Sequence, residues 1–243
     1  MLGEPWPESK WINIYNQRDL MGSSFNIDGV FCGGSRQSPV NIVPGHVKTD
    51  ENLGNFTFVN FSTREVFHNI VNTGHTVQIN LKESMVEIHG GGLNGVYVMH
   101  VVALKKGLTT EDAMVDPEGI AVLGFLIEVR QCVHTPYKKG PWSNLTSHLM
   151  NSTEPVNLTD AISMTDLIGD VDLTKFYRYK GSLTTPMCNE VVIWTVFVEP
   201  IHVHADLLQL FPTKTHLTNR YQPTKALSGR QIYASPAVEL PAG

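Results

Sequence analysis

The residues of this chain that could bind a metal ion are its histidines, and one pair of them has a suitable spacing. His202 and His204 are separated by one residue, and on a β-strand this spacing directs both imidazoles to the same face. The pair follows Glu199-Pro200, so we expect it at the exit of a strand. Two histidines that face solvent are the alternative, and the residues alone leave both interpretations open.

Two further histidines stand alone among uncharged residues. His75 follows Asn72-Thr73-Gly74, and His100 lies inside the apolar segment Val98–Leu104. A lone histidine in an apolar strand is usually a hydrogen-bonded core residue. A role in metal binding or catalysis is the alternative for each.

The segments that must position these histidines are mostly β-strands. Helical periodicity is limited to Asp206–Phe211 and Asp160–Ile168. Two apolar segments, Ile120–Val129 and Val191–Val198, are expected in the middle of a sheet with both faces covered. The predicted strands are rich in β-branched and aromatic residues and are bounded by Gly, Pro and Asn: Phe56–Val59, Thr76–Leu81, Val98–Leu104, Ile120–Val129 and Val191–Val198. The sequence therefore predicts a mostly β fold with small peripheral helices.

Length and composition indicate one mildly acidic domain. The chain has 243 residues, 42% hydrophobic, and a net charge of −5. Its longest basic clusters are the pairs Lys105-Lys106 and Lys138-Lys139, so we expect no nucleic-acid partner. No apolar run approaches the roughly 18 residues that cross a bilayer, so we expect no membrane span.

The signals for cellular location disagree. Met1–Trp6 lacks the charged and apolar regions of a signal peptide. The three cysteines, Cys32, Cys132 and Cys188, allow at most one bridge, and three buried thiols are the alternative. Five Asn-x-Ser/Thr acceptor sites favour a glycosylated protein: Asn55, Asn60, Asn144, Asn151 and Asn157.

Several motifs in order along the chain identify a family. Ser35–Ile42 resembles the Gln-Ser-Pro-(Ile/Val)-(Asn/Asp)-Ile segment of the α-class carbonic anhydrases. Five further segments are similar to motifs of that family: Asn72–Thr76, Gly90–Leu93, Ile120–Leu126, Tyr179–Pro186 and Gly229–Ile232. The resemblance implies a carbonic-anhydrase-like domain over residues 32–235, with a divergent segment before it (1–31) and a short tail after it (236–243).

The resemblance implies a fold, an activity and a cellular location. The fold is a single domain built on a large, mostly antiparallel, twisted sheet. The activity is reversible hydration of carbon dioxide to bicarbonate by zinc hydroxide, and we expect a monomer. The match is closest to the secreted and membrane-anchored branch, of the glycosylphosphatidylinositol-anchored type, so we expect an extracellular or cell-surface protein. That branch carries a disulfide where Cys32 and Cys188 lie, which leaves Cys132 as a thiol.

The resemblance also assigns site residues. His100 matches the third zinc ligand, His75 the proton shuttle, and Thr184 the residue that accepts a hydrogen bond from zinc hydroxide. In the family, the segment of His202 and His204 is a surface connection and not a metal strand. The carbon dioxide cavity is implied to have Thr185 on its polar side and an apolar wall of Val102, Val122, Leu183, Val192 and Trp194.

The segment that carries the family's other two zinc ligands, a His-x-His pair, is absent between Leu93 and Val98. We therefore expect this chain not to bind zinc and to be inactive as written. An active enzyme is the alternative if the full transcript restores that segment, and a zinc-free binding protein or a non-productive isoform is another. Without the segment, either Val98–Leu104 lacks a neighbour or the Gly90–Leu93 hairpin is pulled across the gap, and we expect marginal stability in both cases.

Overall fold

The computed structural model describes residues 32–64, 66–74, 76–81, 85–90, 97–130, 140–159, 162–185, 187–217 and 223–241. The strands are β1 (Lys48–Thr49), β2 (Phe67–Asn72), β3 (Val77–Leu81), β4 (Met85–Gly90), β5 (Tyr97–Leu104), β6 (Ile120–Arg130), β7 (Val156–Asn157), β8 (Phe176–Gly181), β9 (Val192–Phe197), β10 (Ile201–His204) and β11 (Tyr233–Ala234). The helices are the 3-10 turn η2 (Pro44–His46) and α1 (Thr110–Ala113), α2 (Pro141–Ser147), α3 (Met164–Ile168), α4 (Ala205–Leu208) and α5 (Leu210–Thr215).

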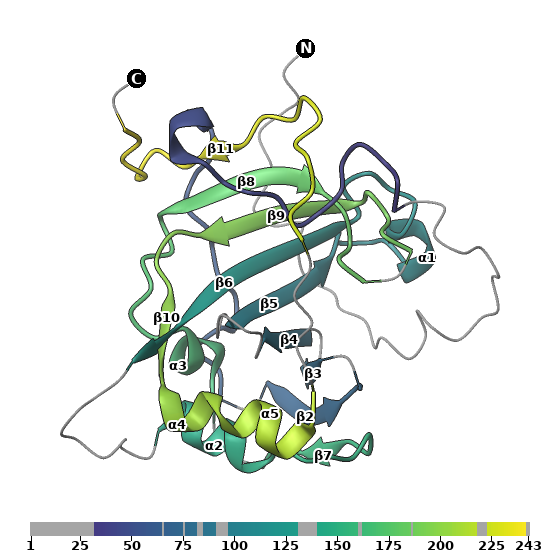
Figure 1. The fold of residues 1–243 in the computed structure, drawn as a ribbon, viewed down its shortest axis with the longest axis vertical. Helices are drawn as coiled ribbons and strands as arrows, with labels where there is room; N and C mark the ends of the chain where they lie inside the picture. The colour runs from purple at the N-terminus through teal and green to yellow at the C-terminus, as the bar shows by residue number, and fades with distance from the viewer. Residues whose placement is uncertain are drawn as a thin grey trace.

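All the strands belong to one sheet, with small helices at its periphery (Figure 1). The order is β1-β11-β8-β9-β6-β5-β4-β3-β2-β7, and β10 pairs with β6 off this path. The pairs β1–β11, β6–β9 and β6–β10 are parallel, and the others are antiparallel. The expected mostly antiparallel sheet is confirmed.

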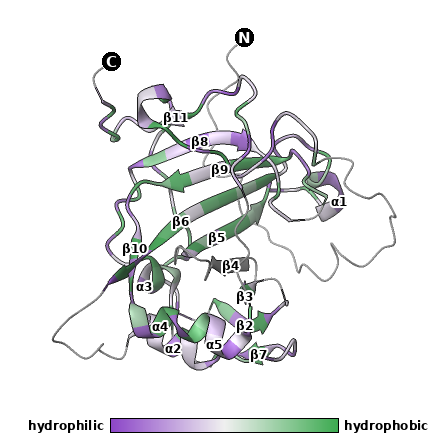
Figure 2. Ribbon diagram, in the orientation of Figure 1, coloured by the Kyte–Doolittle hydropathy of each residue, from purple (hydrophilic) through white to green (hydrophobic). Residues whose placement is uncertain are grey.

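The two faces of the sheet carry separate apolar clusters. One face packs against α2 to α5, with Phe125 and Phe197 stacked at a ring-centroid distance of 4.5 Å. The other face, which we call the site face, carries Val122, Val192 and Trp194, and segments near both ends of the described chain pack there. Figure 2 shows that the central strands β5, β6 and β9 are largely hydrophobic. Both faces of these strands are covered, which explains their nearly continuous apolar sequences.

Most of the predicted elements are present. The strand predictions for 76–81, 98–104, 120–129 and 191–198 correspond to β3, β5, β6 and β9. The predicted helix at 160–168 is the shorter α3, and the one at 206–211 is divided between α4 and α5. Among the described residues, no helix is both long and apolar enough to span a membrane.

Two sequence-based expectations are wrong. Phe56–Val59 is not a strand, because no ladder among the described strands pairs with its backbone, although the Phe56 ring packs on the core 5.0 Å from that of Phe176. Residues 201–204 are not a surface connection but the strand β10. Ile201 and Val203 are buried there, so a ladder with β6 supplies the hydrogen bonds that their backbone needs.

The decisive feature for the site is that β4 pairs directly with β5. The register runs from Met85 opposite Val102 to Gly90 opposite Tyr97. On its other side β5 pairs with β6 along all eight of its residues. The first expected outcome, a β5 without a neighbour, is therefore wrong, and residues 91–93 of the Gly90–Leu93 hairpin named in the second outcome lie outside the described residues.

The capping box of α3 generates a stability prediction. The Ser163 hydroxyl accepts a hydrogen bond from Asp166 N, and the Asp166 carboxylate accepts one from Ser163 N. We expect Ser163→Ala to lower the free energy of unfolding by about 1 kcal/mol, whereas Thr165→Ala at an exposed position of the same helix changes it little. Chemical denaturation of both variants measures the difference, and equal stabilities would contradict the prediction.

The same pair predicts a pH dependence. The hydrogen bonds from Ser163 hold the pKa of the Asp166 carboxyl below its ordinary value of 3.8. A carboxyl whose pKa is lowered by folding stabilises the protein above its unfolded pKa and loses that contribution as the pH falls through the folded pKa. The stability difference between wild type and Ser163→Ala is therefore expected to shrink on acidification below about pH 4.

Candidate functional site

The residues predicted to form the carbon dioxide wall lie together on the site face. Val102 of β5 stands opposite Val122 of β6, and Val122 stands opposite Trp194 of β9. Strand residues that are opposite each other point to the same face, so these three side chains form one row across the sheet. Val122 and Trp194 are buried, and Val102 is half-buried. Val192 and Leu183 belong to the same apolar cluster.

His100 lies beside this row. It is two residues from Val102 on β5, so its side chain points to the same face. Its imidazole meets the Trp194 ring edge-on, with 4.9 Å between ring centroids. The residue opposite His100 on β6 is Gly124, and a Cβ built there would lie 3.8 Å from the indole of Trp194. A methyl group at position 124 would therefore make ordinary van der Waals contact with the indole.

The loop of Leu183, Thr184 and Thr185 is held in place by the segment that precedes β1. Ser182 N donates to the Ser38 hydroxyl at 3.1 Å, and Ser38 N donates to the Ser182 hydroxyl at 3.0 Å. The Tyr179 hydroxyl also donates to the Ser38 hydroxyl, at 3.3 Å. Burial raises the pKa of Tyr179 to about 12, so the phenol stays protonated as this donor. Leu183 N donates to Asn189 O at 2.9 Å, which fixes the loop from its other end.

A disulfide and an ion pair attach the far end of this loop. Cys32 and Cys188 are bonded, which confirms the pairing expected from the resemblance. The Gln37 amide donates to Cys188 O at 3.2 Å and to the Glu190 carboxylate at 3.0 Å, and Arg36 Nε forms an ion pair with the same carboxylate at 3.7 Å. The loop that contains Thr184 is therefore tied to the N-terminal segment at both of its ends. Cys132, the predicted thiol, lies outside the described residues.

The described side chains do not fit the family's zinc set. Within the part of the chain whose side chains are described, no group of three or more His, Cys, Asp or Glu residues could hold a metal ion. His100 supplies one imidazole on the site face, and no described strand carries a His-x-His pair next to it. The three-imidazole set of the resembled family is thus not assembled by these residues.

The His202-x-His204 pair has local partners of its own. His202 Nε2 lies 3.1 Å from the Glu128 carboxylate across the β10–β6 ladder. His204 caps α4, since its Nδ1 accepts a hydrogen bond from Asp206 N at 3.2 Å. The alternative of two histidines that face solvent holds for His202, which is exposed, but not for His204, which is half-buried.

The remaining predicted site residues are spread over the surface or fall outside the described residues. His75 is outside them, but the turn that leads to it is anchored, because Gly74 N donates to the Asn72 side chain at 3.0 Å. The five acceptor asparagines, Asn55, Asn60, Asn144, Asn151 and Asn157, are all exposed. Glycosylation of these residues stays a prediction.

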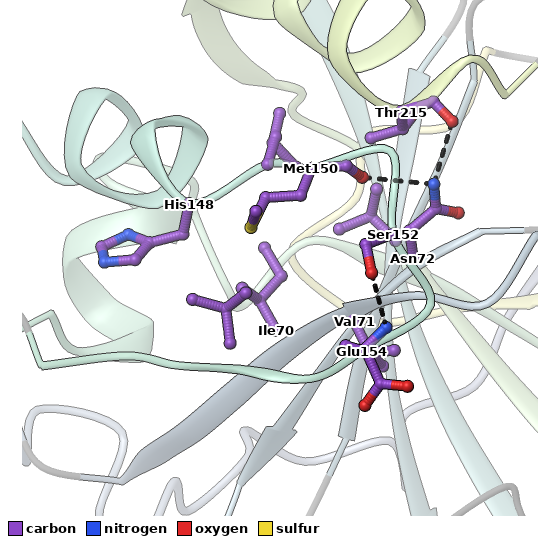
Figure 3. A pocket seen from close by; sticks show the side chains of 11 residues that line it. Ile70, Val71, Asn72, His148, Met150, Ser152, Glu154 and Thr215 are labelled. Carbon is purple, nitrogen blue, oxygen red and sulfur yellow. Dashed lines mark hydrogen bonds between the residues drawn. The ribbon is translucent and has the colours of Figure 1, made fainter.

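A small hollow at the β2 end of the sheet is separate from the site face. It lies between the end of β2, residues 148–156 and the end of α5 (Figure 3). The Asn72 amide closes it by donating to Thr215 O at 2.9 Å and to Met150 O at 3.3 Å. None of the predicted catalytic, metal or cavity residues lines this hollow, so it does not enlarge the candidate site.

One neighbour of His100 was missed by sequence reasoning. The register places Glu87 of β4 directly opposite His100, and Gln78 of β3 opposite Glu87. No sequence pattern identifies this neighbour, because it depends on which strand pairs with β5. Only the pairing of β4 with β5 brings this segment to the site.

Comparisons with known proteins point to one family. A family model described as eukaryotic-type carbonic anhydrase matches residues 23–105 and 96–236. Carbonic anhydrase 4 of Oryctolagus cuniculus is 31% identical over 243 residues, which cover 85% of this chain and 78% of the relative. Putative carbonic anhydrase 3 of Caenorhabditis elegans is 32% identical and is covered to 89% of its length by 82% of this chain. Carbonic anhydrase 6 of Bos taurus is 28% identical, with 84% of this chain and 74% of the relative covered.

The attachment of the Thr184 loop generates a prediction about the disulfide. The bridge closes a sequence separation of 156 residues, so we expect Cys188→Ser to lower the free energy of unfolding by about 2 to 5 kcal/mol. Cys132→Ser, the matched control, is expected to leave stability unchanged under oxidising conditions. Peptide mapping without reduction must show the Cys32–Cys188 peptide, and a bridge to Cys132 would contradict the assignment.

Proposed function

The chain belongs to the eukaryotic-type carbonic anhydrase family, and on that premise we propose that it is an extracellular member that does not hydrate carbon dioxide. The family's active site has two parts, a wall that receives the substrate and a set of three imidazoles that binds zinc. The wall that receives the substrate is retained, and the three-imidazole zinc set is not. Carbon dioxide hydration needs both parts, because the nucleophile is the hydroxide that the zinc generates.

The direct β4–β5 ladder carries this proposal. Six consecutive residues of β4 pair with β5, from Met85–Val102 to Gly90–Tyr97. A strand with a His-x-His pair would have to lie against β5 to bring its imidazoles to His100, and β4 occupies that place. Two features of the comparisons support the same interpretation. The family model matches in two segments that overlap at residues 96–105. The alignment with the rabbit relative is 243 residues long but covers only 85% of this chain, so some residues of that relative have no counterpart here.

The extracellular location rests on the disulfide and the acceptor sites. Structural disulfides form and persist in oxidising compartments, and Cys32–Cys188 joins two segments far apart in the chain. The exposure of all five acceptor asparagines leaves them accessible for glycans. We expect the protein to be a monomer.

A stopped-flow assay of carbon dioxide hydration tests the proposal. The purified full chain, assayed with and without added zinc, is expected to give the rate of a buffer with the same concentration of free histidine. His100→Ala is expected to leave that rate unchanged. A rate clearly above the buffer rate that disappears in His100→Ala would overturn the proposal.

A second experiment tests the location. Expressed with a secretory leader in animal cells, the protein is expected to carry N-glycans, and peptide-N-glycosidase should lower its apparent mass. Replacing each acceptor asparagine by glutamine in turn shows which sites are used. Secreted protein that carries no glycan at any of the five positions would contradict this part of the proposal.

A further inference from the structure

One of the five acceptor asparagines belongs to a helix, and this sets it apart from the others. Asn144 lies inside α2, whereas Asn151 lies in the connection between α2 and β7. Both asparagines are exposed, so a glycan attached to either of them would extend into solvent. The two sites differ in the residues that complete their Asn-x-Ser/Thr triplets.

The other two residues of the Asn144 triplet are buried in the core. Leu145 is 1% exposed, and Thr146 is 0% exposed. The Thr146 hydroxyl donates a hydrogen bond to Trp142 O at 2.8 Å, so it is both covered and already bonded. The third residues of the other four triplets are all exposed: Thr57, Ser62, Thr153 and Thr159. Among the five triplets, that of Asn144 is therefore the one whose hydroxyl cannot be reached from solvent.

The helix also directs the asparagine and the threonine of this triplet to different sides. Successive residues of an α-helix are rotated by about 100°, so side chains two residues apart point roughly 160° away from each other around the axis. Asn144 faces solvent, and the buried Thr146 faces away from it. A transferase that recognises both the amide of the first residue and the hydroxyl of the third cannot contact the two together in this conformation.

Hydrogen bonding and apolar packing hold α2 in place. The Trp142 indole N–H donates to Leu167 O at 2.9 Å, which joins α2 to α3. Trp142 and Leu145 belong to the apolar cluster on this face of the sheet, and α2 lies against α3 and α4 (Figure 1). Exposure of the Thr146 hydroxyl would require the helix to leave this cluster.

We propose that Asn144 is a glycosylation site that folding closes, so that it receives its N-glycan only before α2 forms. In the transfer step, the Asn144 amide nitrogen forms a bond with the first sugar carbon of a lipid-linked oligosaccharide. The bond between that carbon and the pyrophosphate of the lipid carrier breaks, the lipid pyrophosphate leaves, and the amide gives up one proton. The finished glycan is compatible with the folded helix, because the Asn144 side chain is exposed. Asn151 stays open to the same transfer after folding.

This inference rests on the proposed secretion of the protein and deepens it, and separate measurements test the two. Secreted protein without a glycan at any acceptor would overturn the proposed location. Modification of Asn144 on the folded chain in a purified system would overturn this inference and leave the proposed location standing.

Transfer by a purified oligosaccharyltransferase from a lipid-linked oligosaccharide is the experiment. Two full-length chains are made in bacteria, each with four acceptors replaced by glutamine, so that one keeps only Asn144 and its matched control keeps only Asn151. Each chain is assayed folded and disulfide-bonded, and again after reduction and alkylation, with loss of the fold checked by near-ultraviolet circular dichroism. A shift in apparent mass on a gel reports the modification.

The folded state is expected to separate the two chains. The folded Asn144 chain should be modified at least about 100-fold more slowly than the folded Asn151 chain, because the large buried side chains of α2 must first leave the core. After unfolding, the two chains are expected to be modified at similar rates.

A variant outside the triplet tests the role of α2. Trp142→Phe removes the hydrogen bond to Leu167 O and leaves that buried oxygen without its donor. It is therefore expected to raise the transfer rate of the folded Asn144 chain by about 10-fold. The same substitution in the Asn151 chain is expected to leave the rate unchanged. If Trp142→Phe does not fold, the comparison of folded and unfolded chains still decides.

Two results would overturn the inference. One is modification of the folded Asn144 chain at a rate close to that of the folded Asn151 chain. The other is an unfolded Asn144 chain that is not modified, because the triplet would then not be an acceptor at any stage of folding.

Discussion

Every backbone N–H and C=O group of the central strand β5 needs a hydrogen-bond partner, and the rest of the structure depends on how that need is met. One side of β5 is paired with β6, and β4 pairs with the other side from Tyr97 to Val102. Each buried backbone group without a partner costs roughly 1–3 kcal/mol, so an unpaired β5 would use up much of the stability of a domain. Closing the sheet with β4 removes that cost, and it also decides which side chains stand next to His100.

The other half of the site does not depend on this closure. Trp194 is fixed by a hydrogen bond from its indole N–H to Ser182 O at 3.0 Å, and Ser182 is bonded to Ser38 in both directions. The disulfide attaches the end of the same loop to the N-terminal segment. The position of the Trp194 ring and of the Leu183–Thr185 loop therefore does not depend on which strand lies against β5. The loop contacts and the β4–β5 ladder are thus independent features of this fold, because different segments make them.

The sequence predicts the central strands well and the β4–β5 pairing poorly, for physical reasons. Ile120–Val129 and Val191–Val198 are apolar on both faces, which is typical of covered strands, and they form β6 and β9. The motifs place Trp194, Val122 and the disulfide through the resemblance. Nothing local identifies Met85–Gly90 as the partner of β5, because that choice is made by the unpaired ladder and not by the segment itself. The position of Glu87 opposite His100 follows from that register alone, so it could not be predicted from the sequence.

Nuclear magnetic resonance contacts between the backbones of β4 and β5 test the central claim most directly. The register predicts cross-strand proton contacts between Val86 and Val101 and between Ile88 and Met99, with slow amide exchange on both edges of β5. This result would establish that β4 closes the sheet. Slow exchange only for the β5 amides that face β6, with no contact from β5 to β4, would mean that the gap stays open and would contradict the account.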